Sequence, residues 1–561
     1  MTSRVPHPWE ASYPPGCRWD AALEITTLPA LLDRAVARWG ERPALEYRGR
    51  RVTYAALGAL ADRMAAGLLG AGLGAGTTVA LYLPNTPWHP VLFLALARAG
   101  ARIVHLGALD APRELAHKLR DSGARALVTT DLPALLENAG RLRDSGAAER
   151  VLVAPDGYWT GATGAGNAFE SVLPLLDAAP PPAWPVTSPD DVLLLQYTGG
   201  STGQPKGAML THGNLTAAVA IYAAWSDPRT RLEPGEQRVL LVLPLFHIYA
   251  LTAVLLRHLA EGNELLLRPR FDAATVLDDI ETGRVTIFPG VPTMWIGLLN
   301  QPGVEGRDLS SLRSVSSGGA PLPFHVKSRL EAVLGQPLGG GWGMTETSPA
   351  GTRVTPDAPA RPGMIGLPLP GIEMRIVAGD DPCRALPPGE TGEIAIRGPN
   401  VFGGYWNAPG ETAAAFRDGY FLTGDVGWMD GDGYFTLVDR RKNMIISGGF
   451  NVYPNAVEGA IYEHPDVAEC IVIGVPAPYR GEAAKAFVTL RAGAAPLTLD
   501  ALRDFLRDRL GRHEMPAALE VRESLPRSPT GKLLASALRD EARREEAGRE
   551  ATRAAAATDA R

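Results

Sequence analysis

Short hydrophobic runs alternate with Gly, Pro or Ser turns and amphipathic segments along the first two thirds of the chain. The run DVLLLQ (191–196) leads into YTGGSTG, VTIFPGVP (285–292) leads into TMWIGLLN, and LRSVSSGGAPLP (312–323) leads into FHVKSRLEAVL. Because this order is typical of parallel strands joined by crossover helices, it predicts an α/β fold. In such folds the loops that bind ligands follow the carboxyl ends of the strands.

The pattern changes near Gly371. The segments GEIAIRG (392–398), GYFLTGDVGWMD (419–430) and GDGYFTLVDRRKNMII (431–446) combine short alternating runs with Gly and Asp turns. They predict an antiparallel, β-barrel-like region. Beyond Arg440 the chain reads helix, strand, strand, helix and a basic turn, which predicts a compact α+β unit. The last stretch, REEAGREATRAAAATDAR, is typical of a frayed helix or a disordered tail.

These patterns divide the chain of 561 residues into three parts. We expect a large N-terminal domain over residues 1–439, in which parallel-sheet α/β layers are combined with the small β-barrel-like region. A small α+β domain follows over residues 440–540, and residues 541–561 form the tail. At roughly 150 residues per domain, such a chain has room for about three or four structural units.

The apolar stretch Val239–Leu256 has to be weighed as a membrane span. Its 18 residues carry no formal charge, which is close to the minimum of about 17 residues for crossing a bilayer. However, Pro244 ends the run VLLVL, and His247 lies in the middle, where a bilayer would disfavour it. The stretch therefore predicts a strand, a turn and a helix, and no transmembrane span.

The composition disfavours several classes of protein and of binding site. The chain is 45% hydrophobic and 21% charged, with a formal net charge of −6, so it gives no electrostatic support for nucleic-acid binding. Its three cysteines, Cys17, Cys383 and Cys470, lack CxxC spacing and indicate neither a disulfide framework nor a zinc site. The N-terminus has no apolar segment typical of a secretory signal. We expect a cytoplasmic protein.

The stretch YTGGSTGQPKGAMLTHGN (197–214), between an apolar run and an expected helix, is suited to phosphate. Its glycines allow close backbone approach, and its hydroxyls can donate hydrogen bonds to phosphoryl oxygens. It is not a Walker A motif, because Lys206 is preceded by Pro205 and followed by Gly207. The pair Gly531-Lys532 fails the same test. Taken alone, the loop is equally well interpreted as a flexible surface turn.

Five further segments favour the phosphate-binding interpretation of this loop over the surface turn. After YTGGSTGQPKG come, in order, SSGGAPLP, GWGMTETSP, YFLTGDVG, VDRRKNMIISGGFNVYP and LPRSPTGKLL. This series resembles the signature motifs of the adenylate-forming superfamily, which includes acyl-CoA synthetases, firefly-type luciferases and peptide-synthetase adenylation domains. The resemblance runs from about Leu28 to Asp540. Within the superfamily, HPWEASYPPG, ALPPGETGEIAIRGPNVFGGYWNAPGETAAAF and VIGVPAPYRGEAAKAFVTL are similar to bacterial long-chain fatty acid CoA ligases.

The resemblance implies a reaction in two halves. A carboxylate attacks the α-phosphate of MgATP and releases pyrophosphate, and the thiol of coenzyme A then captures the acyl-adenylate. It implies ATP, Mg²⁺ and coenzyme A, with a medium- to long-chain fatty acid as the best-matching substrate. Loading of a separate carrier protein and activation of dicarboxylic or aryl acids stay open. So do a homodimer and peripheral contact with the inner membrane, from which a fatty acid is delivered.

The resemblance also implies roles for individual residues in the first half-reaction. Lys532 matches the adenylation lysine, Glu346 and Thr198 the ligands of Mg²⁺, and Thr345 a contact near the α-phosphate. The residues implied in nucleotide binding are Thr198, Gly199, Gly200, Ser201, Thr202, Gly203 and Lys206 at the β- and γ-phosphates, Gly318, Gly319, Ala320, Pro321, Gly341, Trp342 and Gly343 around the adenine, Asp425 at the ribose, and Arg440 at the ribose or a phosphate. Where Gly340 and Trp342 stand, the family usually has glutamine and tyrosine.

Other positions belong to the second half-reaction and to the acyl pocket. Lys442 matches the hinge about which the family's small domain rotates, and Ser447, Gly448 and Gly449, followed by Phe450, match the thiol tunnel. His247 has either a gating role at the acyl pocket or the role of a satisfied core histidine, with nearly equal support. Together with Phe246, Val291, Pro292 and Met294 it outlines a mostly apolar wall.

Overall fold

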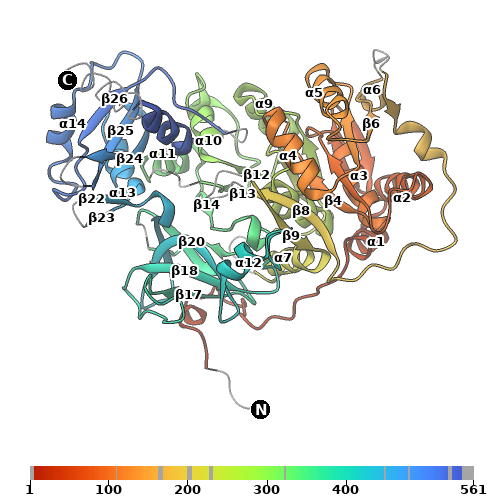
Figure 1. Cartoon of the computed structure of the whole chain (residues 1–561), viewed down its shortest axis with the longest axis horizontal. Helices are drawn as coiled ribbons and strands as arrows, with labels where there is room; N and C mark the ends of the chain where they lie inside the picture. The colour runs from red at the N-terminus through yellow and green to blue at the C-terminus, as the bar shows by residue number, and fades with distance from the viewer. Residues whose placement is uncertain are drawn as a thin grey trace, which may run out of the picture.

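The structure is a computed structural model, and the region it describes comprises residues 5–108, 110–161, 168–198, 205–225, 232–320, 322, 324–359, 361–447, 450–477, 481–528 and 533–545. Figure 1 shows α/β layers on the right and in the centre, an antiparallel sheet below them, and a C-terminal unit on the left. The predicted combination of a large α/β part, a barrel-like sheet and a smaller C-terminal part is confirmed.

The first α/β sheet has the strand order β7-β6-β5-β3-β4-β8-β9. All its pairings are parallel except that of β8 with β9. Its strands β3 and β5 are buried throughout, as expected for parallel strands covered on both faces. The elements are β3 (Thr78–Leu81), β4 (Arg102–His105), β5 (Ala126–Thr130), β6 (Arg150–Ala154), β7 (Glu170–Ser171), β8 (Val192–Thr198), β9 (Lys206–Thr211), α2 (Tyr54–Gly70), α3 (Trp88–Arg98), α4 (Pro112–Ser122), α5 (Pro133–Asp144) and α6 (Gly157–Thr160).

The second α/β sheet has the order β14-β13-β12-β10-β11-β1-β2, parallel except for the pair β1 and β2. The predicted strand-to-helix steps are present, since β12 leads into α10 and β13 leads towards α11. The elements are β1 (Pro43–Tyr47), β2 (Arg50–Thr53), β10 (Arg238–Leu241), β11 (Glu264–Leu267), β12 (Ile287–Gly290), β13 (Ser314–Ser317), β14 (Gly339–Gly340), α1 (Leu28–Trp39), α7 (His212–Ala224), α8 (Arg257–Ala260), α9 (Ala273–Gly283), α10 (Pro292–Leu299) and α11 (Phe324–Leu334).

The helix expected after the glycine-rich stretch is present as α7, and a strand that was not predicted comes before it. Lys206–Thr211 forms β9, which pairs antiparallel with β8, and α7 begins only at His212. Burial alternates from Ala208 to Thr211, which suits a strand that covers the edge of the sheet. Thr211 then caps α7 by accepting a hydrogen bond from the Asn214 backbone N–H at 3.0 Å.

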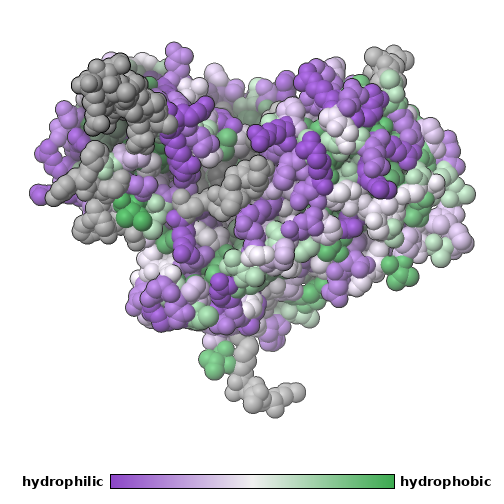
Figure 2. Space-filling model, in the orientation of Figure 1, coloured by the Kyte–Doolittle hydropathy of each residue, from purple (hydrophilic) through white to green (hydrophobic). Residues whose placement is uncertain are grey.

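The apolar stretch Val239–Leu256 folds as strand, turn and helix, as predicted. Most of the run VLLVL belongs to β10, and Tyr249–Leu256 forms a π-helix that continues into α8. Among the residues that the structure describes, none of the helices is both long and apolar enough to cross a membrane. The face of the molecule drawn in Figure 2 is mostly hydrophilic, with apolar residues scattered over it.

The third sheet is antiparallel, as predicted from the change of pattern near Gly371. Its order is β15-β16-β21-β20-β18-β17, with β19 pairing β20. The elements are β15 (Thr352–Arg353), β16 (Met364–Pro368), β17 (Glu373–Val377), β18 (Gly392–Arg397), α12 (Pro409–Ala415), β19 (Phe416–Arg417), β20 (Tyr420–Met429) and β21 (Phe435–Arg440).

The C-terminal unit contains a sheet of order β23-β22-β25-β24, with β26 parallel to β25. Its buried hydrophobic residues from Ile445 onwards form two clusters separate from the core of the large part. The elements are β22 (Ile445–Ser447), β23 (Phe450–Val452), α13 (Pro454–Tyr462), β24 (Val467–Ala477), β25 (Gly481–Leu490), α14 (Leu499–Leu506) and β26 (Ala518–Val521). Residues 535–545 are helical, so 541–545, assigned to the tail from sequence, continue a helix in which Glu541 accepts hydrogen bonds from Arg522.

Candidate active site

The β8–β9 hairpin fixes the two ends of the glycine-rich loop. Thr198 at the end of β8 is the register partner of Lys206 at the start of β9. The predicted phosphate contacts Gly199, Gly200, Ser201, Thr202 and Gly203 lie outside the described residues. The ammonium of Lys206 pairs with the carboxylate of Glu411 in α12. Because Glu411 is 45% exposed, this pair contributes roughly 0–1 kcal/mol, and a phosphate can replace it.

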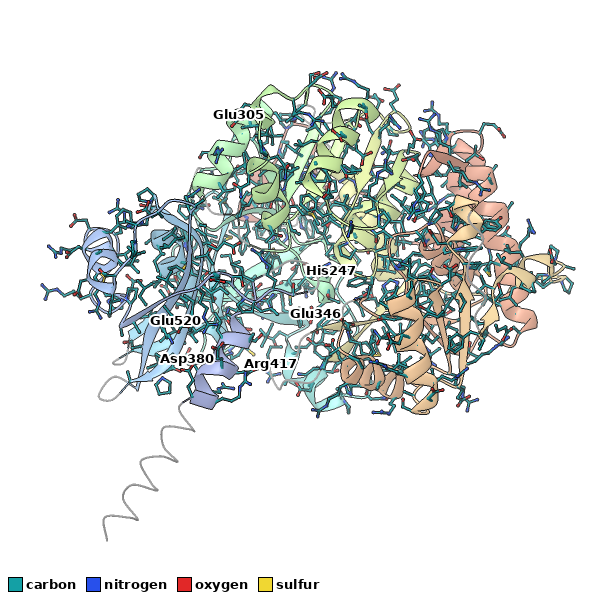
Figure 3. The ribbon with its side chains drawn as sticks, turned by 90° about the horizontal axis from the view of Figure 1, so that it is seen from above. His247, Glu305, Glu346, Asp380, Arg417 and Glu520 are labelled. Atoms are coloured by element: carbon teal, nitrogen blue, oxygen red, sulfur yellow. The ribbon has the colours of Figure 1, made fainter. Side chains whose placement is uncertain are left out.

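Glu346 lies in a short 3-10 helix, Thr345–Thr347, and is buried. Its Oε1 accepts a hydrogen bond from the Tyr405 hydroxyl at 2.9 Å, and its backbone carbonyl accepts one from Phe402. Tyr405 also faces Lys206, whose Nζ lies 5.5 Å from the centroid of the ring. Figure 3 shows the side chain of Glu346 near the middle of the molecule. The tyrosine thus joins the predicted metal ligand to the predicted phosphate lysine.

Backbone pairing with β9 places Tyr405 at this position. The segment around it runs beside β9, since Tyr405 forms an isolated bridge with Ala208 and the Trp406 N–H donates to the Gly207 carbonyl at 2.8 Å. The sequence analysis did not single out Tyr405, although it lies in the long stretch quoted for the fatty acid CoA ligase resemblance. Nothing local distinguishes it, because its role depends on pairing with a distant strand.

The residues at Glu346 fit a Mg²⁺ ion. Burial raises the pKa of Glu346, while the hydrogen bond from Tyr405 opposes that effect by stabilising the carboxylate. Among the described residues, no group of three or more His, Cys, Asp or Glu side chains is suited to a metal. Mg²⁺ in nucleotide sites needs no such group, because it is held by one or two carboxylates together with substrate phosphates. A buried glutamate and Thr198, whose register partner Lys206 faces Tyr405, agree with this arrangement.

Trp342 and Arg440 hold Asp425 from two sides. The indole Nε1–H of Trp342 donates to Asp425 Oδ2 at 2.7 Å, and Arg440 Nε lies 3.1 Å from Asp425 Oδ1. Asp425 is 2% exposed, and Asp425 and Arg440 are register partners in β20 and β21. The predicted ribose contact Asp425, the predicted ribose or phosphate contact Arg440 and the predicted adenine contact Trp342 therefore form one cluster, in which the carboxylate is fixed in orientation.

The glycines expected around the adenine have two different surroundings. A Cβ on Gly343 would lie 1.5 Å from the Pro349 carbonyl oxygen, and one on Gly341 would lie 2.2 Å from the Thr352 carbonyl oxygen. Packing within the protein thus already requires both glycines. Gly319, with φ of +76°, and Gly318 follow β13, beside Val291 and Tyr249 respectively. Ala320 continues this loop, and Pro321 lies outside the described residues.

His247 sits at the turn between β10 and the π-helix. Its Nδ1 accepts a hydrogen bond from the Tyr249 backbone N–H at 3.2 Å, so in the neutral ring the proton is on Nε2. Of the predicted apolar wall, Pro292 and Met294 are buried, while Phe246 and Val291 are half-buried. Figure 3 places the His247 side chain in the same central part of the molecule as Glu346.

Comparison with known proteins identifies the group to which this site belongs. The sequence matches the model of the AMP-binding enzyme over residues 32–406 and that of the AMP-binding enzyme C-terminal domain over residues 456–532. The chain belongs to the AMP-binding enzyme family. The resemblance stated from the sequence motifs is thereby confirmed.

Relatives of this AMP-binding enzyme are similar over nearly the whole chain. The long-chain-fatty-acid–CoA ligase of Bacillus subtilis (strain 168) is 36% identical over 554 residues, which cover 95% of this chain and 98% of that protein. The feruloyl-CoA synthase of an Amycolatopsis species is 41% identical over 504 residues, which cover 88% and 95%. ATP-bound MatB from Rhodopseudomonas palustris has a TM-score of 0.82 at 31% identity, covering 91% of this chain and 98% of that one. The chain is thus an adenylate-forming acyl-CoA ligase by family.

The link between the two parts of this AMP-binding enzyme is organised by Asp439, which sequence reasoning missed. The buried Asp439 carboxylate accepts hydrogen bonds from the Arg440 backbone N–H at 2.6 Å, from the Asn455 backbone N–H at 2.8 Å and from Asn443 Nδ2 at 3.2 Å. It therefore connects β21 with the 3-10 helix Arg441–Asn443 and with α13. Lys442, the predicted hinge residue, lies in that 3-10 helix, and its side chain is outside the described residues.

The remaining predicted positions of the AMP-binding enzyme lie in the C-terminal unit. Ser447 is buried at the end of β22, where it pairs with Phe450 and Gly481. Gly448 and Gly449 lie outside the described residues. Lys532 lies outside them as well, within the basic turn whose flanks are joined by an isolated bridge between Arg527 and Leu533.

A buried polar chain that starts in β8 was also missed. Gln196 in β8 donates from Nε2 to the Phe246 carbonyl at 2.9 Å and faces His105 Nδ1 through Oε1 at 3.1 Å. His105 Nε2 lies 3.2 Å from His89 Nε2. Burial lowers the pKa of His105 to about 4 and that of His89 well below its ordinary value, so both rings are neutral. The chain ties β8 to the turn that carries His247.

Proposed function

We propose that the chain activates a carboxylic acid with ATP, forming an acyl-adenylate and pyrophosphate, and then transfers the acyl group to coenzyme A with release of AMP. One observation carries the proposal. Lys206, Glu346 and Tyr405, from three separate segments, meet at the carboxyl end of β8 beside the cluster of Trp342, Asp425 and Arg440. This grouping supports binding of a nucleotide triphosphate with its phosphates at the loop and its ribose at Asp425.

In the first half-reaction, each side chain has a distinct task. Asp425 accepts hydrogen bonds from the ribose hydroxyls, which a carboxylate does well in bidentate fashion. Lys206 leaves Glu411 and pairs with the β- and γ-phosphates, which gain charge as they depart. Lys532 stabilises the charge that rearranges between the carboxylate and the α-phosphate. Mg²⁺, held by Glu346 and Thr198 with phosphate oxygens, would neutralise part of the phosphate charge.

In the second half-reaction, we propose that the part beyond residue 440 turns relative to residues 1–439. The hydrogen bonds of Asp439 sit at the boundary and involve groups from both sides. Such a boundary, held by polar contacts, supports a hinge at Lys442. The turn would bring Ser447 and the glycines after it to the path of the coenzyme A thiol and would withdraw Lys532.

The acid is proposed to have an extended apolar body, as a medium- to long-chain fatty acid does. The half-buried Phe246 and Val291 with the buried Pro292 and Met294 support an apolar pocket. The Bacillus relative is named for long-chain fatty acids, but the Amycolatopsis relative is named for feruloyl-CoA. The names therefore support acid–CoA ligation more strongly than they support one acid. A separate carrier protein as acceptor stays the alternative to coenzyme A.

A panel of carboxylic acids tests the proposal. Release of AMP and pyrophosphate is measured with and without coenzyme A, and the acids cover saturated chains, dicarboxylic acids and aryl acids. We expect acid-dependent pyrophosphate release and formation of a thioester when coenzyme A is added. If no acid yields AMP, the ligase proposal is wrong. If AMP forms and coenzyme A is never acylated, the acceptor is a carrier protein.

A further inference from the structure

Side chains of the first α/β sheet and its loops hold the turn that follows β10 in the second sheet. Asn85, in the loop between β3 and α3, donates from Nδ2 to the Leu243 carbonyl at 2.8 Å and accepts at Oδ1 from the Leu245 N–H at 2.9 Å. Gln196 in β8 holds the next residue, since its Nε2 donates to the Phe246 carbonyl at 2.9 Å. Three backbone groups of residues 243–246 thus find their partners in side chains from a different sheet.

The amide of Gln196 has only one possible orientation. A carbonyl oxygen accepts hydrogen bonds and cannot donate them, so Nε2 lies at Phe246 and Oε1 lies at His105 Nδ1. The neutral His105 ring therefore carries its proton on Nδ1, and its Nε2 accepts from the Nε2–H of His89 at 3.2 Å. The hydrogen bonds run in one direction, from His89 through His105 and Gln196 to the turn.

The two histidines orient Gln196 and make no bond to the turn themselves. His89, His105 and Gln196 are 0%, 2% and 6% exposed, and the rings of His89 and Phe93 pack against the ring of His105 with centroids 5.0 and 5.5 Å away. The Phe246 carbonyl would be satisfied by Gln196 alone. Because buried polar networks with all partners in place are rigid, the histidines stop the amide from rotating away from Phe246.

The strand β8 links this turn to the phosphate side of the site. Gln196 and Thr198 are two residues apart in β8, so their side chains lie on the same face of the strand. Leu194, on that face as well, belongs to the core that contains Val239 and Leu240 of β10, so the face points towards the second sheet. About 7 Å of strand therefore separates the residue that holds Phe246 from a predicted ligand of Mg²⁺.

The turn carries the predicted acyl wall towards the nucleotide side of the site. His247 follows Phe246 directly, donates its N–H to the Pro244 carbonyl at 2.9 Å and accepts at Nδ1 from the Tyr249 N–H. A Cβ on Gly318, a predicted adenine contact, would lie 3.0 Å from the Tyr249 ring. Figure 3 shows His247 and Glu346 in the same central part of the molecule. A displaced turn would therefore move the acyl wall relative to the nucleotide.

We propose that Gln196 is a positioning residue for adenylation, which aligns the acid at Phe246 and His247 with the phosphates at the end of β8 by holding the Phe246 carbonyl. The inference rests on the proposed ligase function. In adenylation a carboxylate oxygen bonds to the α-phosphorus, and the bond from that phosphorus to the departing pyrophosphate oxygen breaks. A misplacement of about 1 Å can lower the rate of such a step about 10²-fold. Once the adenylate has formed, the two groups are joined covalently and need no further alignment.

The test measures the two half-reactions separately in Gln196→Met, which keeps the length of the side chain and removes the amide. Enzyme in excess is given ATP, Mg²⁺ and the acid that the parent activates fastest, and pyrophosphate release is followed over a single turnover. Thioester formation is measured from supplied acyl-adenylate and coenzyme A. We expect pyrophosphate release to slow about 10- to 100-fold, with thioester formation and KM for ATP close to those of the parent.

Two further variants make the comparison specific. Gln237→Met is the matched control, because Gln237 is 8% exposed and donates from Nε2 to the Glu233 carbonyl at 3.1 Å, at the opposite end of β10. It should leave both rates unchanged. His105→Phe removes the donor to Gln196 Oε1 and leaves the bond to Phe246, so pyrophosphate release should slow less, by about 3- to 10-fold. If Gln196→Met does not fold, His105→Phe decides by the same two rates.

The outcomes separate alignment from general stability. Slower pyrophosphate release with normal thioester formation supports the inference. An equal loss in both half-reactions overturns it, because Gln196 then supports the site as a whole, and so does an unchanged rate or an effect confined to KM for ATP. These three results leave the ligase function standing, since the parent still forms AMP. Absence of AMP from the parent with every acid would instead refute the proposed function and, with it, the inference.

Discussion

The indole nitrogen of Trp342 lies 2.7 Å from Asp425 Oδ2 and donates its hydrogen to it. The family usually has tyrosine at this position, and the sequence suggested only that tryptophan keeps an aromatic wall. The structure adds a polar function, since the indole N–H orients the carboxylate expected at the ribose. Oδ1 is left facing Arg440, so the two oxygens of Asp425 have different partners.

Trp342→Phe keeps the ring and removes the donor. A hydrogen bond to a charged group contributes about 1.5–3 kcal/mol, so we expect KM for ATP to rise roughly 10-fold or more with a smaller change in kcat. Steady-state kinetics with ATP as the varied substrate measure this. Trp428→Phe is the control, because Trp428 lies on the strand of Asp425, β20, and the guanidinium of Arg361 lies 4.5 Å from its ring centroid. An unchanged KM for ATP would contradict a role of the indole in positioning Asp425.

Tyr405→Phe removes the hydroxyl that donates to Glu346. Loss of a partner that orients a metal ligand typically lowers metal affinity or activity about 10- to 100-fold. We therefore expect the Mg²⁺ concentration for half-maximal pyrophosphate release to rise, and excess Mg²⁺ to restore part of the rate. Tyr434→Phe, which loses a hydroxyl contact with Thr355 at 3.0 Å, is the control. A loss of rate that Mg²⁺ never restores would assign Tyr405 to a different task.

Lys532→Ala separates the two half-reactions. Loss of a group that stabilises charge in the transition state lowers the rate about 10²- to 10³-fold, so ATP-dependent formation of the acyl-adenylate should fall by that factor. Formation of the thioester from supplied acyl-adenylate should persist. Lys485→Ala removes a lysine that pairs with Glu520 in the same unit and serves as the control. Adenylate formation at the parent rate would rule out Lys532 as the adenylation lysine.

Glu458→Gln should stabilise the C-terminal unit at high pH. Burial raises the pKa of Glu458 to about 8, and its Oε1 accepts a hydrogen bond from the Val472 N–H at 2.7 Å. The folded state thus binds a proton that the unfolded state releases near pH 4.5, so stability is lost as pH rises from about 4.5 to about 8. We expect the variant to melt higher than the parent at pH 8.5 and close to it at pH 5. The exposed Glu523→Gln should show no such difference.

The two neutral histidines, His89 and His105, predict the opposite dependence of stability on pH. The pKa of His105 is about 4 in the folded protein, and an unfolded histidine has a pKa near 6.5. The unfolded state binds the proton first, so stability falls as pH falls from about 6.5 to about 4. His105→Gln should flatten the melting temperature over this range, whereas His513→Gln should not. An equal slope in parent and His105→Gln would show that another group is responsible.

The sequence predicted those parts of the molecule that depend on local pattern or on motif order. The α/β steps around β12 and β13 and the antiparallel sheet follow from hydrophobic periodicity, and the positions of Lys206, Glu346 and Asp425 from the motif series. The strand β9 was missed because KGAMLT is too short to indicate a strand by itself. The strand forms through its pairing with β8.

Contacts between distant segments could not be predicted. Tyr405 meets Glu346 only after its segment pairs with β9. Such contacts are recognised from the three-dimensional structure, which a linear pattern does not contain.

The separate core of the C-terminal unit has an energetic consequence. Buried hydrophobic residues from Ile445 onwards contact one another and not the core of the large part, so turning the unit would expose little apolar surface. What must change are polar contacts such as those that the buried carboxylate of Asp439 accepts from Asn443 and Asn455, and a hydrogen bond to a charged group contributes about 1.5–3 kcal/mol. In the proposed turn, the replacement of such polar contacts would set the free-energy difference between the two orientations, and the bound substrate would select between them.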